Sequence, residues 1–400
     1  MTEQEKARLL SADVQAFLQA HATDDPARLL LQAPPHPDWP MRLVVQQLQA
    51  RQKARHKLPT WYATPGILFP VGRSVEQASS ERTAAFKASR VSGDLLVDLT
   101  GGFGVDSSFF ARSFARVVSV EADGELSALA AHNGAVFGQC NIAWHSGPAE
   151  TFLPTLDAAP DCIYLDPDRR PDRLHSRVVS LEDARPDVVS WLPALLERAP
   201  RVLIKASPLL DLPRALLQLR TVTQAWVVAV ANECKEVLLL AERQATEPRI
   251  HAVHLTGEAT EETFTFTFAE EAATEVTLAA PQRYLYEPHA ALLKAGAFRT
   301  VGQRYGLAKL HPNSHLYTSQ TLVPDFPGRR WEVGAVTTLN KKALHAHFPE
   351  GRAHVLTRNF PLSPEHIRKK LKLGESDTRS LIATTNPAGK PIVVVGTPLR

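Results

Sequence analysis

Acidic residues and a cluster of glycines stand where the apolar runs of this sequence end. The first run ends in LLVDLTGGFGVD, in which Asp98 is followed by Gly101, Gly102 and Gly104. Glycine lets a backbone turn approach a ligand closely, and a glycine-rich turn between a strand and a helix places that ligand at the carboxyl edge of a parallel sheet. The sequence therefore predicts a small-molecule site at this turn.

The charge of Asp98 discriminates between two cofactors that such a turn can hold. A dinucleotide brings a pyrophosphate, which a carboxylate repels, and Ser107 stands where the dinucleotide pattern has its third glycine. S-adenosylmethionine (AdoMet) carries an ammonium and a sulfonium and no phosphate. Two opposite charges about 4 Å apart attract each other by roughly 4 kcal/mol at an effective dielectric constant near 20. Asp98 therefore favours AdoMet over NAD.

Further acids follow the second and fourth apolar runs. Glu121 lies 23 residues after Asp98, where folds of this kind hold ribose hydroxyls with a carboxylate. Asp123 fits a helix N-cap better than a ligand contact. Asp166 and Asp168, in the segment YLDPDRRP, are expected to face the cleft, where a carboxylate can accept a proton or orient a nucleophile.

The same segment supplies candidate substrate contacts in Pro167, Arg169 and Arg170. An arginine plane can stack on a base or bind phosphate. Lys205, near the end of the fifth apolar run, can bind a substrate phosphate or pair with a strand-tip acid. The competing interpretation of YLDPDRRP is a structural turn in which its acids pair with its arginines.

Positioning these side chains requires a sheet whose strands end at one edge. Between about residues 75 and 245, helical stretches alternate with the apolar runs LLVDLT, RVVSVEA, CNIAWHS, DCIYLD, RVLIKAS, AWVVAVA and EVLLLAE. Such near-continuous Val/Ile/Leu content is typical of strands covered on both faces, and the intervening lengths suit crossover helices. The sequence predicts an α/β fold with a doubly wound, Rossmann-like sheet.

Smaller modules are expected on either side of this sheet. Residues 1–74 are predicted to be helical, over 4–31 and about 40–54. The Rossmann-like domain is expected to span 75–280, and its segments HAVHL and FTFTF alternate with period two, as antiparallel strands do. Residues 281–326 are predicted to form a small βα domain and residues 327–400 a small α+β domain.

Charge is distributed unevenly along the chain. Residues 329–400 hold 13 Lys/Arg against 5 Asp/Glu, a local balance of +8; because the whole chain carries +3, the first 328 residues carry −5. Clustered cations release counterions when they meet phosphates. The C-terminal domain is therefore either a binding surface for a polyanion or a solvated basic surface.

The remaining composition argues against several classes of protein. The three cysteines are far apart and fit neither a disulfide framework nor a zinc site, and the histidines form no convincing metal set, so no metal is predicted. No apolar run reaches the roughly 18 residues of a membrane span. These features predict a cytoplasmic protein with no membrane partner.

Taken together, the turn DLTGGFG, the acid Glu121 and the pair Asp166-Pro167 resemble the class I AdoMet-dependent methyltransferases. Four further segments, EQASSERTAAFKA, NECKEVLLLA, YLYEPHAALLKAG and LHPNSHLYTS, resemble one bacterial branch. Its members join that fold to a ferredoxin-like insert and a THUMP-like C-terminal domain. The resemblance covers roughly residues 60–400 and assigns the ferredoxin-like part to 281–326 and the THUMP-like part to 327–400.

This resemblance implies a set of cofactor contacts. The residues expected to bind AdoMet are Asp98, Thr100, Gly101, Gly102, Gly104, Glu121 and Ala149. Thr100 departs from the pattern, because many methyltransferases have a glycine there. The segment after the third run lacks the acid that often binds the adenine amino group, so backbone near Ala149 is expected to line that pocket instead.

The substrate is less constrained. Methyltransferases of base amino groups carry Asp/Asn-Pro-Pro-Tyr/Phe, whose aromatic ring stacks on a flipped base. The corresponding residues here are Asp166-Pro167-Asp168-Arg169, without the ring. Since THUMP domains bind structured RNA, the resemblance implies tRNA or rRNA as the substrate. The alternatives are a small-molecule or protein methyltransferase, and a non-catalytic RNA-binding protein that retains the fold.

Overall fold

The computed structural model describes residues 1–32, 34–70, 74–169, 181–257 and 260–399. Within these ranges the chain divides into two compact units. We call them unit 1 (Met1–Thr223 and Leu238–Thr246) and unit 2 (Gln224–Val237 and Glu247–Arg400).

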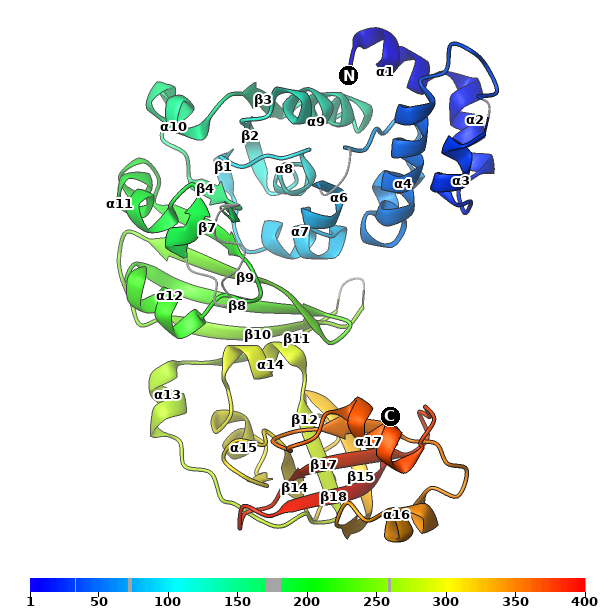
Figure 1. Ribbon diagram of the computed structural model, residues 1–400. Helices are drawn as coiled ribbons and strands as arrows, with labels where there is room; N and C mark the ends of the chain where they lie inside the picture. The colour runs from blue at the N-terminus through cyan, green and yellow to red at the C-terminus, as the bar shows by residue number, and fades with distance from the viewer. Residues whose placement is uncertain (33, 71–73, 170–180, 258–259, 400) are drawn as a thin grey trace. The chain divides into compact units, whose positions relative to one another are not determined.

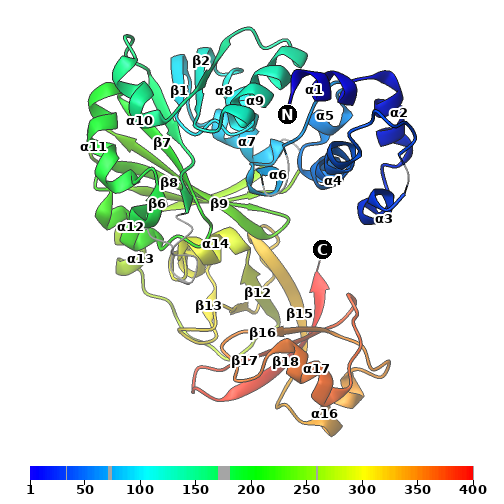
Figure 2. The same cartoon turned by 45° about the horizontal axis from the view of Figure 1, so that its top comes forward.

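Short helices form the N-terminal part of unit 1. They are α1 (Glu3–Leu9), α2 (Ala12–Ala20), α3 (Pro26–Leu30), α4 (Met41–Lys57) and α5 (Pro59–Ala63). Residues 4–31 break into three helices because Ser11 and Asp25 are N-caps, and Pro26 occupies the first position of α3. A buried apolar cluster joins α1, α2, α3 and α4, and Leu129 of α9 (Gly124–Val136) packs against it. Figures 1 and 2 show the ribbons of these four helices in blue.

A large mixed sheet confirms the predicted fold class. Its strands among the described residues are β1 (Gly93–Asp98), β2 (Phe114–Glu121), β3 (Ile142–Ser146), β4 (Cys162–Leu165), β7 (Arg201–Ala206), β8 (Val222–Val230), β9 (Glu233–Glu242), β10 (Arg249–Leu255) and β11 (Glu261–Phe266). Their order is β11-β10-β8-β9-β7-β4-β1-β2-β3. The strands β3, β2, β1, β4 and β7 pair in parallel, so their carboxyl ends share one edge.

The strand order reverses at β1, which lies between β2 and β4. Asp98, the last residue of β1, is opposite Ser119 on one side and Tyr164 on the other. In open α/β sheets a ligand binds in the crevice at such a switch point. The fold therefore places the glycine turn where a ligand is expected.

Helices precede β1 and connect the later strands of this part of the chain. They are α6 (Ser74–Gln77), α7 (Glu81–Ala88), α8 (Val105–Phe110), α10 (Ala149–Phe152), α11 (Val188–Arg198) and α12 (Leu212–Gln218). After Asp166, a short pair of strands, β5 (Asp168–Arg169) and β6 (Ala184–Arg185), lies outside the main sheet. The segments predicted to alternate with period two are β10 and β11, and they pair antiparallel as expected.

A second sheet forms most of unit 2. Among the described residues it contains, in spatial order, β13 (Ala308–Lys309), β14 (Tyr317–Ser319), β12 (Tyr284–Pro288), β15 (Gly328–Thr337), β18 (Pro391–Leu399), β17 (Ser380–Thr385) and β16 (His354–Thr357). Its helices are α13 (Phe268–Ala273), α14 (Ala290–Ala295), α15 (Thr300–Arg304), α16 (Lys341–His347) and α17 (Pro364–Leu371). Residues 281–326 and 327–400, predicted as separate modules, share this sheet through the pairing of β12 with β15.

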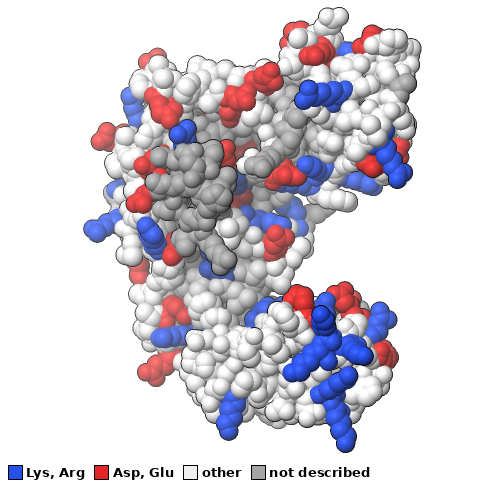
Figure 3. Space-filling model, viewed as in Figure 1, with Lys and Arg blue, Asp and Glu red and all other residues white. Residues whose placement is uncertain are grey.

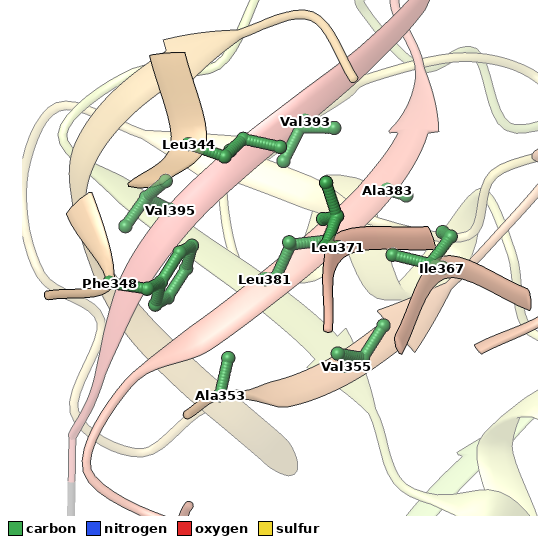
Figure 4. Close-up of a cluster of buried hydrophobic side chains, with 10 residues drawn as sticks. All are labelled: Leu344, Phe348, Ala353, Val355, Ile367, Leu371, Leu381, Ala383, Val393 and Val395. Carbon is green, nitrogen blue, oxygen red and sulfur yellow. The ribbon is translucent and has the colours of Figure 1, made fainter. Parts of the chain in front are cut away.

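The core of the C-terminal part shows how its helices are held. Figure 4 shows Leu344 and Phe348 of α16 together with Ile367 and Leu371 of α17 against buried side chains of β17 and β18. Only one face of α17 is apolar, because Ile367 and Leu371 are four residues apart and lie on the same side of a helix. The charged residues between them therefore point away from the core.

Candidate cofactor site

The carboxylate of Asp98 lies inside the glycine turn. Its side chain is completely buried. One oxygen accepts a hydrogen bond from the Thr100 backbone N–H at 3.0 Å, and the other accepts one from Ser107 Oγ at 2.5 Å. Ser107 also contacts Ser119 Oγ at 2.9 Å. Asp98 thus connects β1, the turn and the first turn of α8.

Thr100 and Gly101 attach the turn to both neighbouring strands. Thr100 Oγ1 accepts a hydrogen bond from the backbone N–H of Asp166 at 2.7 Å, which joins the ends of β1 and β4. The N–H of Gly101 donates to the Val120 carbonyl at 2.8 Å. A Cβ atom on Gly101 would lie 2.2 Å from Ser119 Oγ, so a larger residue there would force the Ser119 side chain to move.

Gly102 and Gly104 adopt left-handed backbone conformations, with φ of 56° and 94°. A Cβ on Gly102 would meet no atom within 4 Å, so this part of the turn is open to close approach by a ligand. A Cβ on Gly104 would instead lie 2.8 Å from the Trp144 ring. Gly102 therefore suits ligand contact, whereas Gly104 suits packing beneath it.

Glu121 occupies the end of β2, next to the turn. One carboxylate oxygen accepts from the Gly102 N–H at 2.7 Å and the other from the Asp123 N–H at 2.8 Å. A carboxylate has about four acceptor positions, so two stay available for a ligand. Asp123 caps α9 by accepting from the N–H groups of Glu125 and Leu126, which confirms the capping interpretation.

Ala149 lies at the same edge of the sheet as Glu121. It is buried and is the first residue of α10. The preceding Gly147 donates its N–H to the Glu121 carbonyl at 2.9 Å, which ties the end of β3 to the end of β2. The sheet thus brings the turn, Glu121 and the Ala149 backbone to one edge, as the sequence predicted.

Asp166 and Lys205 form an ion pair between the ends of β4 and β7. Lys205 is largely buried, with 12% of its side chain exposed, whereas Asp166 is about one-third exposed. Of the two roles expected for Lys205, pairing with a strand-tip acid is the one observed. The pair places a partly exposed carboxylate, with Pro167 after it, beside the turn.

Asp168 follows on β5, where three other charged groups influence it. Its pKa is raised above the usual 3.8, first by desolvation and then by the negative charges of Asp166 and Glu121, against the opposing charge of Lys205. A carboxyl with a raised pKa suits proton transfer. The side chain of Arg169, and Arg170 as a whole, lie outside the described residues.

A buried polar network beneath the turn was missed by sequence reasoning. Lys87 of α7 is fully buried and lies 3.3 Å from Asp106 of α8. Ser79 Oγ at 2.9 Å and Tyr164 Oη at 2.8 Å both donate to the same Asp106 oxygen. Burial alone would raise the pKa of Asp106, but the charges of Lys87 and Lys205 and the hydrogen bonds from Tyr164 and Ser79 hold it below its usual value. The sequence feature that could have revealed this network is a lysine, Lys87, among the apolar residues of the segment AAFKA.

Comparisons with known proteins decide the family. The ferredoxin-like domain model matches residues 284–327 and the THUMP domain-like model matches residues 328–398. A crystal structure from Porphyromonas gingivalis W83, with a provisional assignment as a methyltransferase, is 32% identical, covers 100% of both chains and has a TM-score of 0.89. This chain belongs to the AdoMet-dependent methyltransferases with ferredoxin-like and THUMP-like domains.

Curated relatives agree with this assignment and name the cofactor. Two proteins from strains of Mycobacterium tuberculosis, both named uncharacterized S-adenosylmethionine-dependent methyltransferases, are 23% identical over 356 residues. The match covers 86% of this chain and 93% of each relative. The methyltransferase therefore uses AdoMet, which supplies an electrophilic methyl group when bound.

Asp98 does not lie where a side chain in direct contact with a cationic cofactor would lie. Both oxygens of this carboxylate are engaged by Thr100 and Ser107, and none of the side chain is exposed. The geometry thus favours a role in holding the turn over the direct contact with a cation that the sequence argument required. In this methyltransferase the relatives identify the cofactor, and the turn at Gly102 is open to a ligand.

In the described ranges, no helix combines the length and apolar character needed to cross a bilayer. The same ranges contain no group of three or more His, Cys, Asp or Glu side chains arranged to hold a metal ion.

Burial of Asp98 predicts that the contribution of this side chain to methyltransferase stability falls as pH rises. Desolvation raises its pKa from 3.8 to about 7, so the folded protein keeps a proton that the unfolded chain releases. The resulting stabilisation is complete below about pH 4 and is lost as the pH rises through about 7. We expect Asp98→Asn, which cannot ionise, to gain on the order of 4 kcal/mol of unfolding free energy relative to the wild type across this window.

Urea unfolding of both proteins in steps between about pH 4 and pH 8 measures this difference. Asp94→Asn, at an exposed position on the same strand, is the matched control and should track the wild type at every pH. A difference between Asp98→Asn and the wild type that does not vary with pH would show that Asp98 is ionised throughout.

Proposed function

We propose that this methyltransferase acts on RNA that is bound by its THUMP-like domain. The main support is the basic character of residues 329–400, which contain 13 Lys/Arg and 5 Asp/Glu. Figure 3 shows Lys and Arg side chains gathered over α17. Clustered exposed cations bind a phosphate backbone by releasing its counterions.

The centre of this surface is a group that we call the α17 patch, formed by Lys369, Lys370 and Lys372. All three are exposed. They cannot turn inward, because Ile367 and Leu371 occupy the buried face of the helix. Arg368 is less available, since it pairs with Glu375 at 2.5 Å. The patch presents three positive charges within one helical turn and its C-cap.

We further propose that the open turn and Glu121 hold the cofactor. Gly102 leaves open space beside its half-buried backbone for the amino-acid end of AdoMet, and Glu121 has acceptor positions left for ribose hydroxyls. Thr100, Gly101 and Gly104 keep the turn in shape, and the Ala149 backbone lines the adenine side. In this proposal Asp98 holds the turn in place, and the other residues surround the cofactor.

For the substrate side, we propose that Asp168 accepts a hydrogen bond or a proton from the attacking atom. Its raised pKa suits this task, and it lies close enough to Asp166 and Glu121 for their charges to act on it. Asp166, fixed by Thr100 and Lys205, positions the segment through Pro167. The attacking atom then displaces the methyl group in line, and most of the rate comes from positioning.

Incubation with labelled AdoMet and separate RNA, protein and metabolite pools tests this proposal. We expect label in RNA. Lys369→Glu/Lys370→Glu should lower RNA affinity at least tenfold near physiological salt, because about two phosphate contacts are lost, and should leave AdoMet affinity unchanged. Asp168→Asn should lower kcat with little effect on either affinity.

The matched control is Arg28→Glu/Arg214→Glu, which removes two exposed arginines of unit 1 from α3 and α12. It changes net charge equally and should leave RNA affinity unchanged. Label in the protein or metabolite pool, with none in RNA, would refute the RNA substrate while retaining the enzyme. Equal loss of affinity in both double variants would refute a specific role of the α17 patch.

A further inference from the structure

A pocket of about 270 Å³ lies within unit 2, remote in sequence from the glycine turn. Its wall combines residues of β10 and β11, the start of α14, and residues 324–330 before and within β15. Typical pockets for drug-sized ligands measure roughly 300–1,000 Å³. This pocket is at the small end of that range and suits a single ring system better than a whole nucleotide.

His289 contributes a hydrogen-bond donor with no partner to this pocket. The residue is 2% exposed. Its Nδ1 accepts a hydrogen bond from the Leu292 N–H at 3.3 Å and so caps α14. Burial lowers the pKa of His289 to about 3, so the ring is neutral and must carry its proton on Nε2. That Nε2 is buried and has no hydrogen-bond partner.

Arg330 contributes a second donor of this kind. Its terminal nitrogen Nη1 donates to the Pro324 carbonyl, but its Nε is buried and has no partner. The neighbouring Arg329 differs, because its guanidinium is held by the buried carboxylate of Glu287, with a 2.8 Å contact from Nε. Buried donors without partners are costly, and each calls for an explanation.

The charges around these two donors argue against a simple anion as the ligand of this pocket. Glu262 and Asp325 also line the pocket, so its two arginines face two acids. His254 Nε2 accepts from the Asn232 N–H at 3.1 Å, which leaves the His254 proton on Nδ1, 3.7 Å from Glu262. A phosphate would meet two carboxylates at close range. A neutral ligand with both acceptor and donor atoms meets no such opposition.

We propose that this pocket binds one unpaired nucleobase of the RNA substrate, away from the methyl-transfer site. The proposal rests on the RNA substrate proposed above. The two orphan donors, His289 Nε2 and Arg330 Nε, serve ring acceptors, and the carboxylates of Glu262 and Asp325 serve amino or imino donors of the same base. Guanine combines acceptors at O6 and N7 with donors on its other edge. RNA recognition commonly reads such exposed bases.

Guanosine binding to the full chain, measured by calorimetry with saturating S-adenosylhomocysteine, tests this site. S-adenosylhomocysteine, the product left by AdoMet after methyl transfer, keeps nucleosides out of the cofactor site. We expect guanosine to bind with 1:1 stoichiometry. His289→Asn keeps an N-cap acceptor for α14 but removes the Nε2 donor, and Arg330→Lys keeps the charge but removes Nε. Each should weaken guanosine binding about three- to tenfold.

His345→Asn and Arg28→Lys make the same chemical changes at exposed positions and should bind guanosine like the wild type. Absence of guanosine binding, unchanged affinity in both pocket variants, or displacement of guanosine by inorganic phosphate would overturn the site. Guanosine binding without RNA methylation would refute the RNA substrate alone. RNA methylation without guanosine binding would refute the pocket alone.

Discussion

Replacing Gly104 with alanine is expected to lower the affinity for AdoMet about 100-fold. Gly104 has φ of 94°, which costs alanine roughly 1–2 kcal/mol, and the new Cβ would lie 2.8 Å from the Trp144 ring and 3.2 Å from Ala130 Cβ. Since Trp144 lies on β3 and Ala130 on α9, the turn itself must move. A misplacement of about 1 Å in a site can lower a reaction rate about a hundredfold, and we expect a loss of similar size in cofactor affinity.

Gly138→Ala provides a matched control for this effect. Gly138 also has positive φ, at 67°, but a Cβ there would meet no atom within 4 Å. Both variants should lose similar stability from backbone strain, whereas only Gly104→Ala should lose cofactor affinity, as measured by calorimetry with AdoMet. Equal affinities in the two variants would show that the turn tolerates displacement or that the cofactor binds elsewhere.

The sequence was sufficient for the location of the site because strand ends follow directly from apolar runs. LLVDLT, RVVSVEA and DCIYLD became β1, β2 and β4, and their carboxyl ends meet at one edge whatever the details of packing. The same reasoning placed Glu121 and Asp166 beside the turn. Parallel strand pairing strongly constrains where the strand ends lie, so a few residues at those ends are enough to predict the position of the site.

The direction of the Asp98 side chain was beyond the reach of the sequence. A strand end locates a carboxylate but does not show whether it points to solvent or into the first turn of the next helix. Here Ser107, nine residues later, donates to Asp98 and selects the inward direction. Ser107 stands where the dinucleotide pattern has its third glycine, and a hydroxyl at that position is the feature that indicates an inward-pointing carboxylate.

The buried network around Lys87 was missed for a related reason. Its members Ser79, Lys87, Asp106 and Tyr164 come from four separate segments, so no local pattern joins them. Only the packing of α7 against α8 brings the lysine to Asp106. The position of a charged residue on an apolar helical face predicts a buried partner but does not name it.

Lys87→Met is expected to lower the free energy of unfolding by about 3–5 kcal/mol, because it leaves Asp106 buried without the cation that contacts it. Lys87 is fully buried, and the Asp106 side chain is 10% exposed, so water has little access to solvate the carboxylate that loses its partner. Typical total stabilities are about 5–15 kcal/mol, so the loss is a large share. Lys235→Met, which breaks an exposed pair with Glu233, should cost under about 1 kcal/mol by the same urea measurement.

Adding Asp106→Asn to Lys87→Met separates a charge effect from a packing effect. If the cost comes from an unpaired carboxylate, removing that carboxylate should restore at least about 2 kcal/mol, so the double variant is more stable than Lys87→Met alone. Ser79 and Tyr164 can still donate to the amide oxygen of the asparagine. Costs that simply add would mean that Lys87 acts through packing, and that the turn above it needs no buried cation.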